Sequence, residues 1–133
     1  MDMKFDWDPS MEMGIPEIDE QHKELFRIAR EIERLIITQA DNPDRKAILE
    51  GLCEVRDYVT YHFYTEENII RERAIEQLES HKASHDAFLD QIQAIDCDAL
   101  VANPVQELAR IKMMIQDWLF QHILVEDRAI PKA

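Results

Sequence analysis

Glycine and proline are scarce in this chain of 133 residues, which contains two glycines and five prolines. Gly14, Pro9 and Pro16 all fall within the first sixteen residues, so few helix-breaking residues remain in the rest. No stretch approaches the roughly 18 apolar residues of a membrane span. The start, MDMKFDWDPS, has acidic residues where a signal peptide carries basic ones. We therefore expect a largely helical, soluble, cytoplasmic protein with no membrane partner.

Basic residues and cysteines are also in short supply. The 15 Lys and Arg are outnumbered by 28 Asp and Glu, giving a formal charge of −13. A polyanion would be repelled, so nucleic acid is excluded as a partner. Cys53 and Cys97 lack the spacing of a metal site, and in an unexported chain we interpret them as reduced residues of helices.

Apolar residues recur at helical spacing in four segments, which predicts four amphipathic helices. The predicted ranges are 18–38, 43–70, 76–95 and 104–122. Pro43 is expected in the first turn of the second helix, and Asn103 is expected to cap the fourth, with Pro104 behind it. Helices of about 20 residues joined by short turns favour antiparallel neighbours. The sequence thus predicts an all-α fold, an antiparallel up-down-up-down four-helix bundle.

This bundle is expected to form one domain, residues 1–133, with the helices in 18–127 and a leader in 1–17. The leader is too broken by Pro and Gly to be helical. We expect it to lie across the bundle as an extended lid that packs Phe5, Trp7 and Ile15.

All the histidines of the chain fall on these apolar stripes, and a glutamate continues one of them. The residues are His22, His62, Glu66, His81, His85 and His122. Residues four apart share one face of a helix, so His62 and Glu66 can point at the same centre, as can His81 and His85. A single histidine on an apolar face is more often a hydrogen-bonded core residue than a ligand. Five of them with a buried glutamate would carry a desolvation cost of about several kcal/mol per unpaired charge. Because a bound metal removes that cost, the pattern predicts a buried metal site.

A second carboxylate near His122 is left ambiguous by periodicity. At roughly 100° per residue, Glu126 is nearly in line with His122, whereas Asp127 is turned about 140° away. Periodicity alone selects Glu126. Asp127 can reach the centre only if the helix ends or widens there, as in a π-type turn.

The combined motifs resemble the hemerythrin family, specifically the single-domain bacteriohemerythrins. They are IDEQH, HFYTEE, HKASH and WLFQHILVED. The resemblance covers nearly the whole chain, from the FDW leader with Gly14 and Ile15 to Asp127. It implies a hemerythrin-like domain, whose myohemerythrin members are known four-helix bundles. It also selects Asp127 over Glu126 as the ligand.

By this resemblance the site is a non-haem di-iron centre with a bridging oxo or hydroxo group. The implied ligands are His81, His85 and His122 for one iron, His22 and His62 for the other, and Glu66 and Asp127 as bridges between both. Five imidazoles, two carboxylates counted twice and one bridging oxygen fill about eleven of roughly twelve positions of two octahedral ions. One position, on the iron with two histidines, would remain open.

Hemerythrins bind O₂ reversibly, so the resemblance implies an O₂-binding protein for storage, delivery or scavenging, and not an enzyme. The residues expected to line the O₂ pocket are Phe63, Ile70, Trp118, Leu119 and Ile123. Ordinary core packing is the alternative interpretation of the same residues. Ile70 stands where many members have Met.

Two other functions remain open: a di-iron oxidoreductase, such as a peroxidase or nitric oxide reductase, and an oxygen- or iron-sensing module. The chain lacks the paired Glu-x-x-His motifs of carboxylate-rich di-iron proteins.

Overall fold

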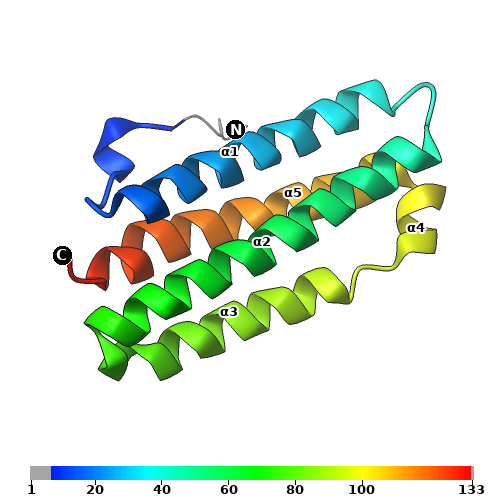
Figure 1. The fold of residues 1–133 in the computed structure, drawn as a ribbon. Helices are drawn as coiled ribbons and strands as arrows, with labels where there is room; N and C mark the ends of the chain where they lie inside the picture. Colours follow the sequence, from blue (N-terminus) through cyan, green and yellow to red (C-terminus); the bar gives the residue numbers. More distant parts are fainter. Residues whose placement is uncertain (1–6, 133) are drawn as a thin grey trace.

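The computed structural model describes residues 7–132 and shows four long helices packed side by side (Figure 1). Their bounds are α1 (Pro16–Thr38), α2 (Arg45–Arg73), α3 (Leu78–Gln93) and α5 (Pro104–Gln121). α1 contacts both α2 and α5, and α2 contacts α3. Successive long helices run in opposite directions, which confirms the predicted up-down-up-down bundle.

The second helix begins later than the sequence suggested. Asp44 is its N-cap, and the Asp44 carboxylate accepts hydrogen bonds from the backbone N–H groups of Lys46 at 3.0 Å and Ala47 at 3.4 Å. These bonds satisfy two donors that have no partner within the helix. Pro43 therefore lies before the cap and not in the first turn, so that expectation was wrong.

The connection between α3 and α5 contains a short helix, α4 (Cys97–Ala102), where the sequence pattern predicted only a short turn. Asp96 caps α4 by accepting from the backbone N–H of Asp98 at 2.9 Å. α5 then begins as predicted, with Asn103 at the cap position and Pro104 as its first residue. The Asn103 side chain makes no capping hydrogen bond, so the fixed φ of Pro104 is the stronger start signal.

The described part of the leader is anchored to the start of α1 by a buried carboxylate. Asp19 accepts from the backbone N–H of Met13 at 2.9 Å and of Gly14 at 3.2 Å. Gly14 has a φ of 85°, a conformation that residues with a side chain rarely adopt. The leader is not extended throughout, because Pro9–Met11 forms one turn of 3₁₀ helix.

Trp7 packs its ring edge-on against Phe26 of α1, with ring centroids 5.5 Å apart, while Ile15 is buried. Both therefore pack against the bundle as expected. Phe5, the other residue expected to pack there, lies outside the described residues.

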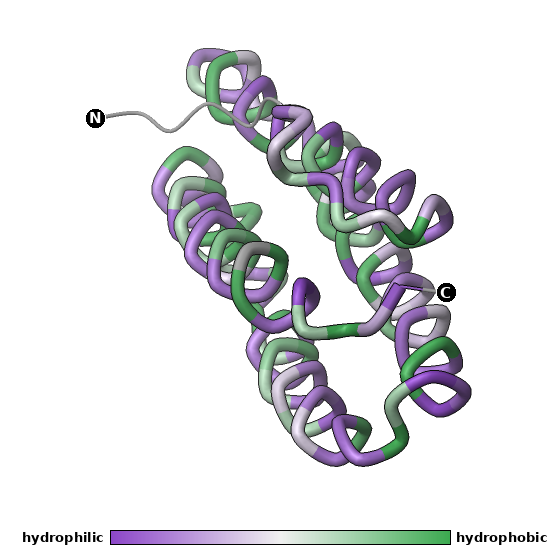
Figure 2. The backbone as a smooth tube through the Cα atoms, turned by 90° about the vertical axis from the view of Figure 1, so that its left-hand side faces the viewer, coloured by the Kyte–Doolittle hydropathy of each residue, from purple (hydrophilic) through white to green (hydrophobic). Residues whose placement is uncertain are grey.

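The bundle interior consists of two apolar clusters with a layer of buried polar residues between them along the helix axes. On α1, Ile18 of the smaller cluster precedes His22, and Leu25 of the larger cluster follows it. On the antiparallel α2 the order is reversed, since Val59 precedes His62 and Ile70 follows Glu66. Figure 2 shows hydrophilic and hydrophobic residues alternating along each helix, as amphipathic packing requires.

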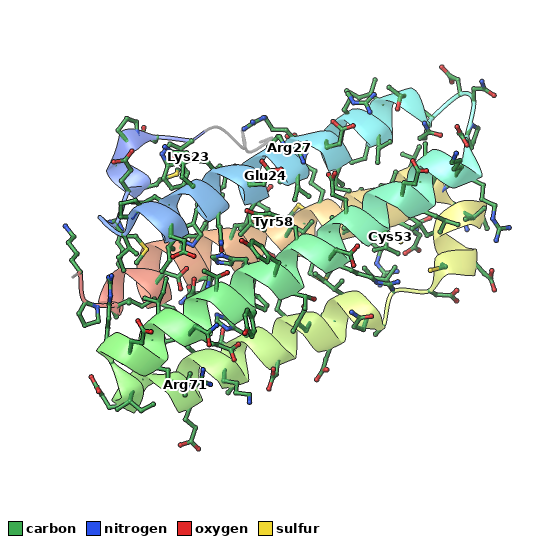
Figure 3. All side chains as sticks on the ribbon, in the orientation of Figure 1. Lys23, Glu24, Arg27, Cys53, Tyr58 and Arg71 are labelled. Carbon is green, nitrogen blue, oxygen red and sulfur yellow. The ribbon has the colours of Figure 1, made fainter. Side chains whose placement is uncertain are left out.

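The outer helix faces carry charged side chains, and Cys53 lies among them (Figure 3). Arg27 of α1 contacts Glu24 at 2.7 Å and Glu54 of α2 at 3.4 Å, an exposed arrangement that contributes about 0–1 kcal/mol. Cys53 and Cys97 are exposed and unpaired, in agreement with their interpretation as ordinary helix residues. None of the helices in residues 7–132 is long and apolar enough to cross a membrane.

Candidate metal centre

The structure brings the seven predicted ligand residues together in one buried cluster between the helices. Each side chain belongs to a residue that is at most 5% exposed. They are His22 on α1, His62 and Glu66 on α2, His81 and His85 on α3, and His122 and Asp127 at the end of α5 and just beyond it.

Glu66 occupies the middle of this cluster and approaches every histidine of the chain. Its Oε2 lies 3.0 Å from Nε2 of His62 and 3.8 Å from Nε2 of His22. Its Oε1 faces the other three rings, at 3.6 Å from His81, 3.0 Å from His85 and 3.0 Å from His122. The two oxygens of one carboxylate are therefore turned toward two different sets of imidazoles.

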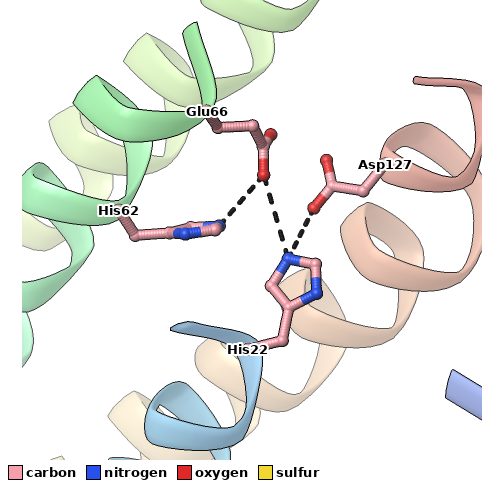
Figure 4. A group of neighbouring side chains, drawn as sticks. All are labelled: His22, His62, Glu66 and Asp127. Atoms are coloured by element: carbon pink, nitrogen blue, oxygen red, sulfur yellow. Dashed lines mark hydrogen bonds and ion pairs between the residues drawn. The ribbon is translucent and has the colours of Figure 1, made fainter. Parts of the chain in front are cut away.

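Asp127 likewise turns its two carboxylate oxygens toward different sets of histidines. Its Oδ2 lies 2.8 Å from Nε2 of His22, whereas its Oδ1 lies 2.9 Å from Nε2 of His122 and 3.8 Å from Nδ1 of His81. Figure 4 shows the first set, with His22 and His62 both pointing at Glu66, and His22 also pointing at Asp127. Both carboxylates thus lie between a two-histidine set and a three-histidine set.

Asp127 reaches the cluster because the chain widens into a π-helical turn at His122–Glu126. The backbone N–H of Asp127 donates to the carbonyl of His122, five residues earlier, where an α-helix would bond four residues earlier. The extra residue in the turn rotates Asp127 inward. Glu126 instead has an exposed fraction of 31% for its side chain and approaches the outer nitrogen of His122 at 3.3 Å. The condition under which Asp127 can reach the centre, a helix that ends or widens there, is therefore met.

Two opposing effects set the pKa values in the cluster: burial, which disfavours the charged form of each group, and nearby opposite charges, which favour it. Burial lowers the pKa of His62 below its ordinary value. Burial also lowers the pKa of His22 and of His122, but the carboxylates of Asp127 and Glu66 outweigh it and raise both pKa values. Burial raises the pKa of Glu66, yet His122 and His62 hold that pKa well below its usual range. The neighbouring imidazoles therefore stabilise the Glu66 carboxylate in its ionised form.

Unsatisfied polar atoms gather in the cluster, which is the arrangement that a bound cation would complete. Five buried atoms of its side chains make no hydrogen bond with other atoms of the described residues: His22 Nδ1, His62 Nε2, Glu66 Oε2, His81 Nδ1 and Asp127 Oδ1. Four of them point toward other cluster members at 2.9–3.8 Å. A buried polar atom without a hydrogen bond costs about 1–3 kcal/mol. Imidazole nitrogens and carboxylate oxygens together are the donor set of first-row transition metals, so these residues fit a metal.

Two further polar contacts of the cluster were not expected from the sequence. Gln21 accepts from Nδ1–H of His62 at 2.8 Å, and Glu67 accepts from Nδ1–H of His85 at 2.9 Å. Both residues adjoin a predicted ligand in the motifs, Gln21 beside His22 and Glu67 beside Glu66. Their position next to a predicted ligand was the only hint in the sequence. The position of a residue around a helix does not tell whether its side chain contacts a ligand histidine or lies at the surface.

Four of the five residues expected around an O₂ pocket lie in one apolar cluster beside the imidazoles: Phe63, Trp118, Leu119 and Ile123. Phe63 stacks on the ring of His85 with centroids 4.0 Å apart, and Trp118 stacks on His122 at 4.1 Å. Ile70 is fully buried in the other apolar cluster, toward the leader.

Beside this wall lies a cavity of about 10 Å³ with only apolar or aromatic lining residues. They are Leu25, Ile28, Val55, Val59, Phe88, Ile115, Trp118 and Leu119. A cavity of this size and polarity does not favour water. The core next to the polar cluster is therefore predominantly apolar.

Comparison with known proteins agrees with this geometry. The family profile described as the hemerythrin HHE cation binding domain matches residues 13–133. A bacteriohemerythrin of Clostridium acetobutylicum is 26% identical over 124 residues, which cover 93% of this chain and 96% of that protein. A myohemerythrin of Theromyzon tessulatum is 29% identical over 119 residues, covering 90% and 84%. A hemerythrin-like protein of Naegleria gruberi is 31% identical over 123 residues, covering 92% and 87%.

The matched region contains the four long helices and every residue of the buried cluster. Three observations agree. The chain forms a helical bundle, its central layer of histidines and carboxylates suits a cation, and the family match covers most of the sequence. The chain belongs to the hemerythrin family.

Proposed function

We propose that the cluster holds two iron ions and that the protein binds O₂ reversibly. His22 and His62 would hold one ion, and the three-histidine set of His81, His85 and His122 would hold the other. The observation that carries the proposal is the division of the carboxylates, because Glu66 and Asp127 each turn one oxygen to either set. Such carboxylates are positioned to bridge two ions.

An iron pair bound there would supply the redox chemistry that reversible O₂ binding needs. The protein's own contribution is to fix the imidazoles and to exclude water. Phe63 and Trp118 stack on ligand rings and restrict their rotation, while Leu119 closes the apolar side at 1% exposed. A dry pocket limits the proton transfer from water that would leave the iron oxidised. These features favour binding of O₂ over its turnover as an enzyme substrate.

Metal analysis tests the di-iron part of the proposal. Protein expressed in iron-replete cells should contain two iron ions per chain, because the cluster offers two sets of nitrogen donors that share their carboxylates. Elemental analysis against protein concentration measures the ratio. A ratio near one, or zinc in place of iron under iron-replete conditions, would contradict the proposal.

The O₂ part is tested by spectra of the reduced protein. Mixed with O₂, it should form an oxygenated state without a second substrate and return to the reduced spectrum under argon. Leu119→Ala should make the oxygenated state decay several-fold faster to the oxidised one, because removing this side chain lets water approach. Stopped-flow mixing followed by timed spectra separates binding from decay.

Leu108→Ala is the matched control, since Leu108 is equally buried in the same cluster but lies fourteen residues before His122 on α5. Both variants lose about 2–5 kcal/mol of stability, but only Leu119→Ala should shorten the life of the oxygenated state. Catalytic turnover of peroxide or nitric oxide by the unmodified protein, without release of intact O₂, would favour the oxidoreductase alternative.

A further inference from the structure

The outer nitrogens of the imidazoles have different partners in the two histidine sets. For His85 and His122 of the three-histidine set these partners are carboxylates. Nδ1–H of His85 donates to Glu67 Oε2 at 2.9 Å, and Nδ1 of His122 lies 3.3 Å from Glu126 Oε2. The inner Nε2 atoms of both rings face Glu66 at 3.0 Å. Each ring is therefore held between an outer carboxylate and the centre of the cluster.

In the two-histidine set no carboxylate of the described residues fills this role. Nδ1–H of His62 donates to the neutral amide oxygen of Gln21 at 2.8 Å. The amide orientation is fixed, because Nε2 of Gln21 donates to Thr65 Oγ1 at 3.2 Å while the Thr65 hydroxyl donates to the carbonyl of Tyr61. The outer Nδ1 of His22 is buried and makes no hydrogen bond within residues 7–132.

A carboxylate and an amide affect a ligating imidazole differently. A carboxylate that accepts the outer N–H draws the proton toward itself, which increases the electron density on the inner nitrogen and makes it a stronger metal donor. An amide fixes the ring in the same orientation but adds no charge. Two negative charges thus stand behind the three-histidine set, and none of the observed outer partners of the two-histidine set is charged.

We propose that Glu67 and Glu126 make the three-histidine position the tighter of two metal positions, and that Gln21 keeps the two-histidine position the weaker. This inference rests on the proposed function, which requires two ions in the cluster. In this inference, Glu67, Glu126 and Gln21 act as positioning residues that set the donor strength of the imidazoles they contact. The two positions would therefore differ in affinity although their ions would share Glu66 and Asp127. The tighter set keeps the neighbouring ion in place.

Stepwise binding of Co²⁺ to the apoprotein tests this assignment without any O₂ chemistry. Calorimetric titration of the unmodified protein should resolve two binding steps of unequal affinity. Glu67→Gln keeps an acceptor of the same shape but removes the charge, so it should weaken the tighter step about tenfold and leave the weaker one nearly unchanged. Glu72→Gln is the control, because this exposed residue of the same helix gives an identical change in net charge.

The reciprocal variant places a charge behind the other set. Gln21→Glu should strengthen the weaker step and narrow the difference between the two affinities. A merely structural role of position 21 predicts the opposite, since disturbing the Thr65 contact could only weaken binding. The melting temperature of each apoprotein separates loss of fold from loss of affinity. If Gln21→Glu does not fold, Glu126→Gln serves as a second test and should weaken the tighter step alone.

The outcomes separate this inference from the function on which it rests. Uptake of fewer than two Co²⁺ ions by the unmodified protein would overturn both. Two ions bound with equal affinity would overturn the inference alone. Equal weakening of both steps by Glu67→Gln, or an effect no larger than that of Glu72→Gln, would also overturn the inference and leave the di-iron proposal intact.

Discussion

Replacing Asp127 with Ala should reduce the metal content from the proposed two ions per chain to about one or fewer and abolish the spectrum expected of a coupled iron pair. Asp127 is fully buried, and its two oxygens approach His22 at 2.8 Å and His122 at 2.9 Å. Without it, the two histidine sets share only Glu66. Metal analysis and the absorption spectrum of the oxidised protein measure the loss.

Glu126→Ala is the matched control, since it removes a carboxylate one residue away. The Glu126 side chain is 31% exposed and touches only the outer nitrogen of His122 among the cluster residues, so this variant should retain two ions and the coupled spectrum. Its metal affinity should fall only modestly. The reverse pattern, with the pair lost in Glu126→Ala and kept in Asp127→Ala, would mean that regular α-helical geometry continues past His122.

The contrast between Glu126 and Asp127 marks the limit of periodicity as a guide to this site. Six cluster residues lie on regular helical stripes, and their inward direction follows from spacing alone. The seventh does not, because one extra residue in the π-helical turn shifts the phase by roughly 100°. Only the resemblance to a known family selected Asp127 in advance. A local change in hydrogen bonding leaves no trace in a hydrophobic pattern.

The ends of the helices and the hydrogen-bond partners behind the histidines were predicted less well than the central parts of the helices. Asp44 caps α2 although Asn42 and Pro43 formed an equally plausible start signal, and only the packed structure decides between them. The roles of Gln21 and Glu67 depend on contacts with histidines 41 and 18 residues away in the chain. Spacing within one helix carries no information about such pairings. The four-helix architecture, by contrast, follows from four amphipathic segments with short connections.

Removal of the metal should lower the melting temperature by about 10 °C or more at neutral pH. A ligand that binds only the folded state stabilises it by about 4 kcal/mol at a thousandfold excess over its dissociation constant, and this cluster offers two positions. The apoprotein must also keep unsatisfied polar atoms buried. Calorimetry of chelator-treated and reconstituted protein measures the difference. Equal melting of both forms would show that the histidines do not bind the metal.

The difference in melting temperature between the metal-bound and metal-free forms should shrink as the pH falls from about 7 to 5, because metal binding requires neutral imidazoles.

In the apoprotein, the pKa shifts of the buried histidines act on stability in opposite directions. The lowered pKa of His62 gives stability that is present above 6.5 and lost as the pH falls through its folded value. The raised pKa values of His22 and His122 give stability that is present below 6.5 and lost as the pH rises. Because these effects oppose each other, the apoprotein should respond to mild acid less steeply than the metal-bound form, and the contribution of Glu66 to its stability should be lost as the pH falls below 4.5. The metal-bound form should instead lose stability steeply, since five imidazoles compete with protons, and thermal scans of both forms at matched pH values would test the contrast.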